Sequence, residues 1–508
     1  MLVADAGGGG AVQPTIQATA PAAPPRDAKV DDAVQRTIQV SKMGPEPDHA
    51  VAYQMQQTLN DSNLSQAQKD EYIAQMAEYA TGPWVCTPKG DDHQRSIDAV
   101  GKAFEDIGTA WSGDETPQLR QQVTDAIGRD VNSGRLDAND LYALVDPSKN
   151  PQSDGARQLL TGIRDGAVLN RLSDMLLTDA KREGYNIDKQ QNGPATLVAA
   201  ADIANMAAAN GSTASAKAIV TEIGAQMAKG PVAGDMTLMQ AMMATTVGGQ
   251  YGNGIPGRTG FDALSGLVNS ANSSDPALQK VTDSMFATLV RSGDDKTVGG
   301  LDQAGDRKGA LGSLDTYMSN NIQRLNENGW RYDSAGSQYE NLVQDFTSKV
   351  LLDSDNPNRD GTTDAITTEM NRLGTIAFDP HASANDRNAA AQGLGELVGS
   401  AKAGANDAYA NQKGDNEAKI ETIRFFTDKI TDKIADLAGP LSDAVKAGVD
   451  TGWGAAGDAA NNKSRSEIDQ ATKGITDLAN GLRIKLGDLN NAPLIAAYDQ
   501  RFTEHVPD

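Results

Sequence analysis

Cysteine and histidine are scarce in this chain of 508 residues, which contains one cysteine, Cys86, and four histidines. One cysteine cannot form an intrachain disulfide, and so few cysteines and histidines exclude a zinc-finger framework. Aromatic residues make up only 5% of the chain. Nowhere do about 18 uncharged apolar residues follow one another, so we expect no constitutive membrane span. The stability of the fold must come from packing of small and aliphatic side chains.

Positively charged residues are fewer than negatively charged ones. The chain has 45 Lys and Arg residues and 68 Asp and Glu residues, which gives a formal net charge of −23. Nonspecific binding to nucleic acid requires a positive field, so we expect no nucleic-acid partner. The N-terminal residues have neither a basic segment nor an apolar run of about 7–15 residues. We therefore expect no Sec signal peptide.

Residues 1–45 are rich in Ala, Pro, Gly, Gln and Thr and contain few large apolar side chains. Such a segment cannot bury enough surface to offset the loss of chain entropy on folding. We therefore predict a disordered N-terminal leader. Two interpretations stay open: a flexible tail, or an address read by a specialised bacterial secretion machine.

After the leader, apolar residues recur at helical spacing almost throughout the chain. Ser65 and Gln68 form a predicted capping box, and Asp275-Pro276 predicts the start of another helix. The clearest amphipathic stripe in the first half consists of Ile97, Val100, Phe104, Ile107 and Trp111. Because no segment alternates strictly with β-branched enrichment, we predict a mainly α protein.

The number of domains is less clear from the sequence than the fold class. Units of about 35–45 residues with two helices each can be drawn from 92 to 400, but no residue recurs at matching positions. The prediction is thus an irregular multi-helix bundle or a helical array. Stretches rich in glycine and polar residues give provisional divisions into an N-terminal helical region, 46–250, and a central helical region, 258–402.

Residues 416–508 are predicted to form a C-terminal amphipathic helical hairpin. Its first apolar stripe consists of Ile420, Ile423, Phe426, Ile430, Ile434 and Leu437. Residues 439–440 are Gly-Pro and should end this helix, and the reversal is expected at residues 454–464. The hairpin either packs on the rest of the chain as ordinary core or opens to bind a partner helix or a bilayer.

The segment from Asp130 to Leu141 resembles a calcium-binding loop. It offers oxygen ligands at Asp130, Asn132, Asp137 and Asp140 around the turn residue Gly134. The loop is one residue short before that glycine, which would remove a ligand. The alternative is two helices joined without metal, with Asp137 capping the second.

A second acidic segment, residues 353–364, also contains many residues of the ligand type. In each register it lacks one requirement of a calcium loop, either the glycine in its place or the final glutamate. We expect a solvated connection between helices there. Calcium is thus the one cofactor that the sequence suggests.

Evidence for catalysis is weaker. The nearest histidine to Cys86 is His93, and no known nucleophile signature surrounds the cysteine, so we expect a buried or incidental thiol. The histidines are expected to be surface or capping residues. The side chains of Met236, Met239, Met242 and Met243 are spaced for one helical face, and they suit either the core or an adaptable partner surface.

This acidic, almost cysteine-free composition favours a non-enzymatic helical protein for recognition or scaffolding. We expect a bacterial secreted effector or toxin-associated protein, exported by a specialised system other than Sec and cytoplasmic before export. Its partners would be proteins, among them a secretion chaperone. One alternative is a structural or assembly component of a phage virion. Another is a hydrolase effector whose site forms only in three dimensions.

Overall fold

The structure of the chain is a computed structural model, and every regular element in its described part is helical, with no β-strand there. This finding confirms the predicted mainly α fold. The structure describes residues 27–43, 47–81, 91–108, 116–147, 154–232, 234, 236–245, 259–271, 273–292, 300–301, 304–327, 342–411, 416–435, 442–443, 468–489 and 491–506.

The first half of the chain forms short and medium-length helices. In chain order they are α1 (Ala28–Val40), α2 (Pro47–Asn60), α3 (Gln66–Thr81), α4 (Asp91–Gly108), α5 (Thr116–Asn132), α6 (Ala138–Val145), α7 (Asp154–Gln158), η1 (Leu159–Gly162), α8 (Gly166–Glu183), η2 (Ile187–Lys189), α9 (Gly193–Ala209), α10 (Ala214–Met227) and α11 (Leu238–Ala244).

The second half contains the longest helices. In chain order they are α12 (Gly260–Ser270), α13 (Pro276–Arg291), α14 (Arg307–Glu327), α15 (Leu342–Phe346), the π-helical turn η5 (Thr347–Leu351), α16 (Arg359–Phe378), α17 (Ala384–Asn411), α18 (Asn416–Ala435), α21 (Lys473–Asp488) and α22 (Ala492–His505).

Local hydrogen bonds explain where several helices begin. The backbone N–H of Ser65 donates to Oε1 of Gln68 at 2.8 Å, and the N–H of Gln68 donates to Oγ of Ser65 at 3.3 Å. This is the predicted capping box, and α3 begins directly after it. At α13, the side chain of Asp275 accepts from the N–H of Ala277 at 2.9 Å, and Pro276 is the first helical residue.

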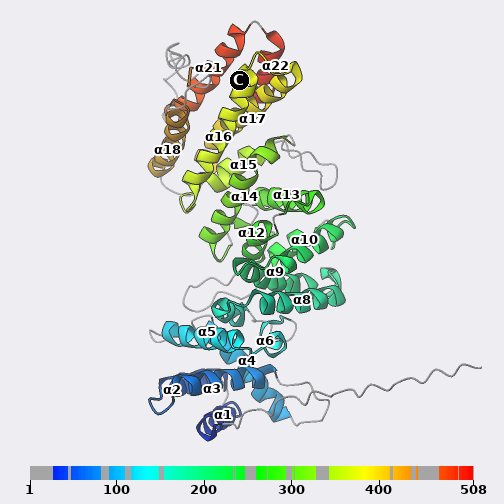
Figure 1. The fold of residues 1–508 in the computed structure, drawn as a ribbon, viewed down its shortest axis with the longest axis vertical. Helices are drawn as coiled ribbons and strands as arrows, with labels where there is room; N and C mark the ends of the chain where they lie inside the picture. The colour runs from blue at the N-terminus through cyan, green and yellow to red at the C-terminus, as the bar shows by residue number, and fades with distance from the viewer. Residues whose placement is uncertain are drawn as a thin grey trace, which may run out of the picture.

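The helices stack along one long axis, with α1 at one end and α21 and α22 at the other (Figure 1). Most helices pack on elements that lie one to three places away in chain order, as α8 does on α9, α9 on α12, and α12 on α14. The same pattern continues through α14, α16 and α17. Of the two predicted architectures, the structure is the helical array.

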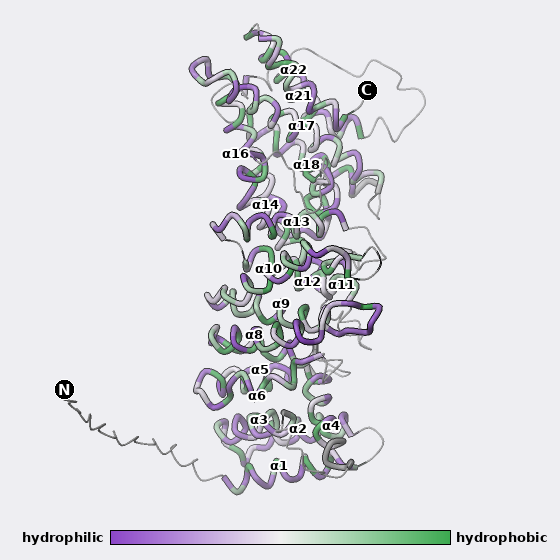
Figure 2. Tube along the Cα trace, turned by 90° about the vertical axis from the view of Figure 1, so that its right-hand side faces the viewer, coloured by the Kyte–Doolittle hydropathy of each residue, from purple (hydrophilic) through white to green (hydrophobic). Residues whose placement is uncertain are grey.

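One hydrophobic core runs through the stack, from Val30 in α1 to Tyr498 in α22. Figure 2 shows hydrophobic and hydrophilic segments alternating along the helices, as expected when one face of each helix is buried. Three buried aromatic side chains meet at one junction between helices. The ring centroid of Phe286 lies 4.9 Å from that of Tyr317 and 5.9 Å from that of Phe346, which joins α13, α14 and α15.

Glycine allows neighbouring helices in this stack to approach closely. A Cβ atom added at Gly395 in α17 would lie 2.4 Å from the carbonyl oxygen of Tyr498 in α22. A Cβ at Gly128 in α5 would lie equally close to the carbonyl oxygen of Gly162 in η1. Contacts of this kind give part of the chain's 51 glycines a packing role inside helices.

The N-terminal leader differs in extent from the prediction. Residues 1–26 lie outside the described residues, but Ala28–Val40 forms α1, which packs on α2 and α3. Asp27 caps this helix, and Val30, Ala33 and Val34 are buried. The predicted disorder does not apply to residues 28–40 because small apolar residues at helical spacing suffice to bury one face.

Most of the apolar stripes lie where their spacing predicts. In α4, Val100, Phe104 and Ile107 are buried and Ile97 is partly buried, while Trp111 lies outside the described residues. Of the four methionines, Met239, Met242 and Met243 are buried in or beside α11, in agreement with a core role. The expectation for Met236 was wrong, because Thr237 caps α11 and Met236 precedes the helix.

The C-terminal helices pack against the body of the stack. Helix α18 contacts α16, α17 and α21, and α22 lies along α17 in the most extensive helix contact of the described residues. Ile423, Phe426, Ile430 and Ile434 of the predicted stripe are buried, whereas residues 437, 439–440 and 454–464 lie outside the described residues. This arrangement agrees with packing as ordinary core.

Candidate functional site

Asp137 and Asp140 of the calcium-loop candidate form the start of helix α6. The N–H of Asn139 donates to Oδ1 of Asp137 at 2.6 Å, and the N–H of Asp137 donates to Oδ2 of Asp140 at 2.7 Å. The two carboxylates therefore make a capping box. Burial raises the pKa of Asp137, but hydrogen bonds from the N–H groups of Asn139 and Asp140 outweigh it and hold this pKa below its usual value.

Asp130 and Asn132 lie at the end of α5. Oδ1 of Asp130 is 4.0 Å from Nη1 of Arg135, and burial raises the pKa of Asp130 to about 7. Oδ1 of Asn132 accepts a hydrogen bond from the N–H of Arg164 at 3.3 Å. These side chains thus join α5 to the segments that follow it, and calcium binding by the four residues stays a prediction.

We expected a solvated connection in the second acidic segment. The segment is instead partly helical and partly buried. Helix α16 begins at Arg359, within the segment. Asp353 and Asn356 are buried, and the carboxylate of Asp353 forms an ion pair with Arg307. The backbone carbonyl oxygen of Asp353 also accepts from Nη2 of Arg359 at 2.7 Å. The expectation was wrong because these arginines, one 46 residues away, provide partners for the acidic segment.

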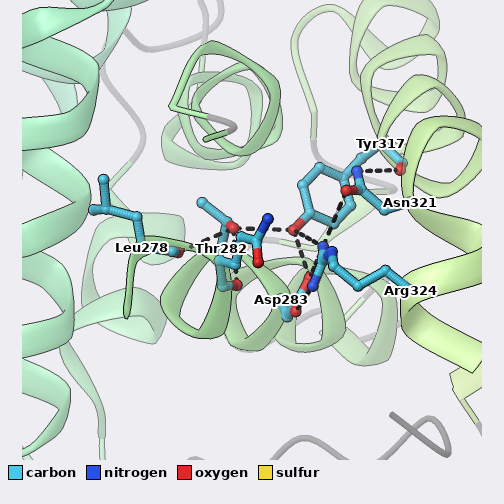
Figure 3. Close-up of polar contacts among 7 residues, drawn as sticks. Leu278, Thr282, Asp283, Tyr317, Asn321 and Arg324 are labelled. Carbon is cyan, nitrogen blue, oxygen red and sulfur yellow. Dashed lines mark hydrogen bonds and ion pairs between the residues drawn. The ribbon is translucent and has the colours of Figure 1, made fainter. Parts of the chain in front are cut away.

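A buried polar cluster joins α13 to α14 (Figure 3). The hydroxyl of Tyr317 donates to Oδ1 of Asp283 at 2.6 Å, and Nη2 of Arg324 donates to the same oxygen at 2.7 Å. Nη2 of Arg324 also donates to Oδ1 of Asn321 at 3.0 Å. Burial raises the pKa of Tyr317, and the neighbouring carboxylate of Asp283 raises it further. Since Asp283 and Tyr317 are buried, we assign this cluster to holding the stack together.

Three carboxyl groups have strongly raised pKa values, and burial is the main cause for each. The pKa of Asp106 is raised to about 6, that of Asp130 to about 7, and that of Asp315 to about 6. They belong to α4, α5 and α14 respectively. Perturbed groups that converge on one cleft indicate an active site, but α14 lies in another part of the stack from α4 and α5 (Figure 1).

Histidine and aspartate side chains meet near the N-terminal end of the stack. Asp48 and His49 lie in the first turn of α2, and Asp106 lies in the last turn of α4. One potential ligand atom from each of the three lies within 4.8 Å of the others, and no other group of three such side chains does so in the described part of the chain. Sequence reasoning missed this group because 57 residues separate His49 from Asp106.

The predictions for Cys86 and for the histidines have different outcomes. Cys86 lies outside the described residues, and His93 belongs to α4. His381 is exposed, as expected. The expectation of a surface or capping role was wrong for His505, whose side chain is 2% exposed and lies 2.9 Å from Glu396, measured from Nε2 to Oε1.

Large exposed apolar side chains are few among the described residues, and they are spread over the stack. They are Met43, Tyr53, Ile187, Phe425 and Leu489. Isolated residues of this kind are normal on a protein surface. None of the described helices combines the length and the apolar character that crossing a bilayer requires.

No protein-family model matches the sequence, and no curated protein matches it. Among solved structures, a crystal complex of SYS-1 and POP-1 contains a chain that is similar over 94% of this chain and 92% of its own, with 10% identity and a TM-score of 0.28. A crystal structure of SYS-1 is similar over 95% and 93%, with 10% identity and a TM-score of 0.27. The function proposed below rests on this chain's own residues.

Proposed function

We propose that the chain is a non-enzymatic helical scaffold that binds protein partners along its length. The observation that carries this proposal is the stacking of successive helices on near neighbours along one long axis. A stack of this kind exposes one continuous side of many helices, and stacked helical proteins use such extended surfaces for binding. A partner would therefore contact several successive helices.

The charge of the chain supports a partner with a basic surface. A net charge of −23 creates a negative field that attracts positive surfaces and accelerates their encounter. The attraction between exposed charges is screened within about 8 Å at physiological ionic strength. Binding should thus weaken as salt is added.

The finer form of the proposal is a bacterial secreted effector or toxin-associated protein. Its support is the composition: an acidic chain with a single cysteine and an N-terminal segment rich in Ala, Pro, Gly and Gln. Under this proposal the chain is cytoplasmic before export by a specialised system other than Sec. A secretion chaperone would then be one of its protein partners.

The test uses the full chain and the purified products of the coding regions beside its own. Calorimetry should find one product that binds at a fixed stoichiometry, with an affinity that falls as salt rises. Hydrogen exchange of the complex should show protection over the exposed faces of several successive helices. Protection confined to one loop cluster would contradict the extended binding surface.

Light scattering of the full chain separates the proposal from its rivals. A scaffold of the effector type should be a monomer alone and a defined complex with its partner. A closed symmetric oligomer of the chain alone would favour a virion component. Hydrolytic turnover by the chain alone, without any partner, would overturn the non-enzymatic proposal.

A further inference from the structure

The side chains of Asp48, His49 and Asp106 bring two carboxylates and one imidazole together between two helices. Nε2 of His49 lies 3.8 Å from Oδ2 of Asp106, and Asp48 lies beside both. Asp48 and Asp106 are largely buried, whereas a third of the His49 side chain is exposed. A small ion could therefore reach this group from the solvent on the side where His49 is exposed.

We propose that Asp48, His49 and Asp106 bind a divalent transition-metal ion of the zinc type, which fastens α2 to α4. The donor set supports this class of ion. An imidazole nitrogen is a good ligand for zinc and its neighbours, whereas calcium and magnesium prefer oxygen ligands only. Three protein ligands leave the fourth tetrahedral position of zinc to a water molecule.

The observed distances are close to those that zinc requires. Bonds of about 2.0–2.2 Å from zinc to nitrogen and oxygen place two ligands of a tetrahedral site about 3.4 Å apart. The ligand atoms of the three side chains lie within 4.8 Å of one another, and the His49 to Asp106 distance is 3.8 Å. Small rotations of the side chains would therefore close the site, with no movement of either helix.

The burial of the two carboxylates also favours a bound cation. The side chain of Asp106 is 12% exposed and that of Asp48 is 7% exposed. A divalent ion in contact with buried carboxylates would offset the desolvation of their charge.

Lys102 supplies a cation to the same place. Its ammonium forms an ion pair with Asp48, and Lys102 lies one helical turn before Asp106 on α4. The Lys102 side chain is 49% exposed, so its ammonium can move into water when a metal binds. Lys102 is therefore a competitor of the metal.

The experiment is a calorimetric titration of the metal-free full chain with zinc chloride. One zinc ion should bind per chain, and magnesium and calcium should not compete for the site. His49→Ala and Asp106→Asn should each weaken zinc binding by at least 10-fold, since changing even a residue that only hydrogen-bonds a zinc ligand costs about 10–100-fold. Lys102→Met should strengthen zinc binding because it removes the competing ammonium.

The matched control is His381→Ala, which removes an exposed histidine far along the chain from the site and should leave the zinc affinity unchanged. Circular dichroism of each variant checks that the helices are intact. If Asp106→Asn does not fold, the His49 and Lys102 variants decide the question alone. The proposal would be overturned if His49→Ala bound zinc as tightly as the wild type. It would also be overturned if neither the wild type nor Lys102→Met bound zinc. Zinc binding at this site does not depend on the scaffold function.

Discussion

Nε2 of His505, in the last turn of α22, lies 2.9 Å from Oε1 of Glu396 in α17. Both side chains are buried, and Nδ1 of His505 lies 3.3 Å from Oε1 of Gln344 in α15. Gln344 in turn donates through Nε2 to Oδ2 of Asp407 at 2.6 Å. The C-terminal helix is thus held on the stack by a chain of polar contacts as well as by apolar packing.

His505→Ala should loosen α22. The substitution removes a buried imidazole together with its contacts to Glu396 and Gln344, and losses of this kind cost about 0.5–3 kcal/mol. Native-state hydrogen exchange should show that the free energy of opening α22 falls by this amount. Gln500→Ala, at an exposed position of the same helix, is the control and should change it by less than about 0.5 kcal/mol. Equal effects of the two variants would show that the His505 contact is unimportant.

Asp283→Asn should be among the most destabilising single changes in the central helices. It leaves the guanidinium of Arg324 without its carboxylate partner in a largely buried position, and breaking such a pair costs about 3–5 kcal/mol. Tyr317→Phe keeps this ion pair and removes only the hydroxyl that contacts Asp283, Thr282 and Arg324, so it should cost less, about 1–2 kcal/mol. Hydrogen exchange in α13 and α14 measures both, and the predicted order of the two effects is the test.

Asp315 should make the stack less stable as the pH rises. Burial raises the pKa of its carboxyl group from 3.8 to about 6. The folded chain therefore binds this proton more tightly than the unfolded chain does. The associated stability is fully present below about pH 4 and is lost as the pH rises through about 6.

Asp315→Asn removes that dependence, because the amide is neutral at every pH. At pH 8 the variant should be more stable than the wild type by up to about 3 kcal/mol, at 1.36 kcal/mol per pKa unit. At pH 4 the two should be nearly equal. Urea unfolding of both proteins at the two pH values provides the measurement, and a wild-type advantage at pH 8 would contradict the assignment.

Gly395→Ala should push α22 away from α17. The added Cβ would lie 2.4 Å from the carbonyl oxygen of Tyr498, and overpacking of this kind costs about 1–3 kcal/mol. Gly361→Ala is a matched control, because a Cβ there meets nothing within 4 Å. It should change stability by less than about 1 kcal/mol and in the favourable direction. Thermal unfolding midpoints of the two variants should move in opposite directions.

Local sequence patterns predicted the helices and several of their boundaries. Ser65 with Gln68 and Asp275 with Pro276 begin helices because the bonds that form a helix end join residues two to four positions apart. Spacing also identified buried faces, such as the one that contains Phe104 and Ile107. Both kinds of signal involve only residues of one helix and its ends, so they can be identified from a single sequence.

Contacts between helices could not be predicted in this way. Arg157 and Asp202 form a buried ion pair and are 45 residues apart. No local sequence pattern around either residue identifies the other as its partner. The same holds for His49 and Asp106, and for Glu396 and His505. Spacing shows which side of a helix is buried, but which helix covers that side depends on how the whole stack assembles.

Helical stacking on near neighbours has a mechanical consequence. A chain whose helices pack mainly on nearby ones should unravel in successive steps when its two ends are pulled apart, so that each step lengthens the molecule at a modest force. The C-terminal end is an exception, since α22 returns along α17 and shields its apolar side. Extension should therefore begin at α1, with the C-terminal segment resisting longest.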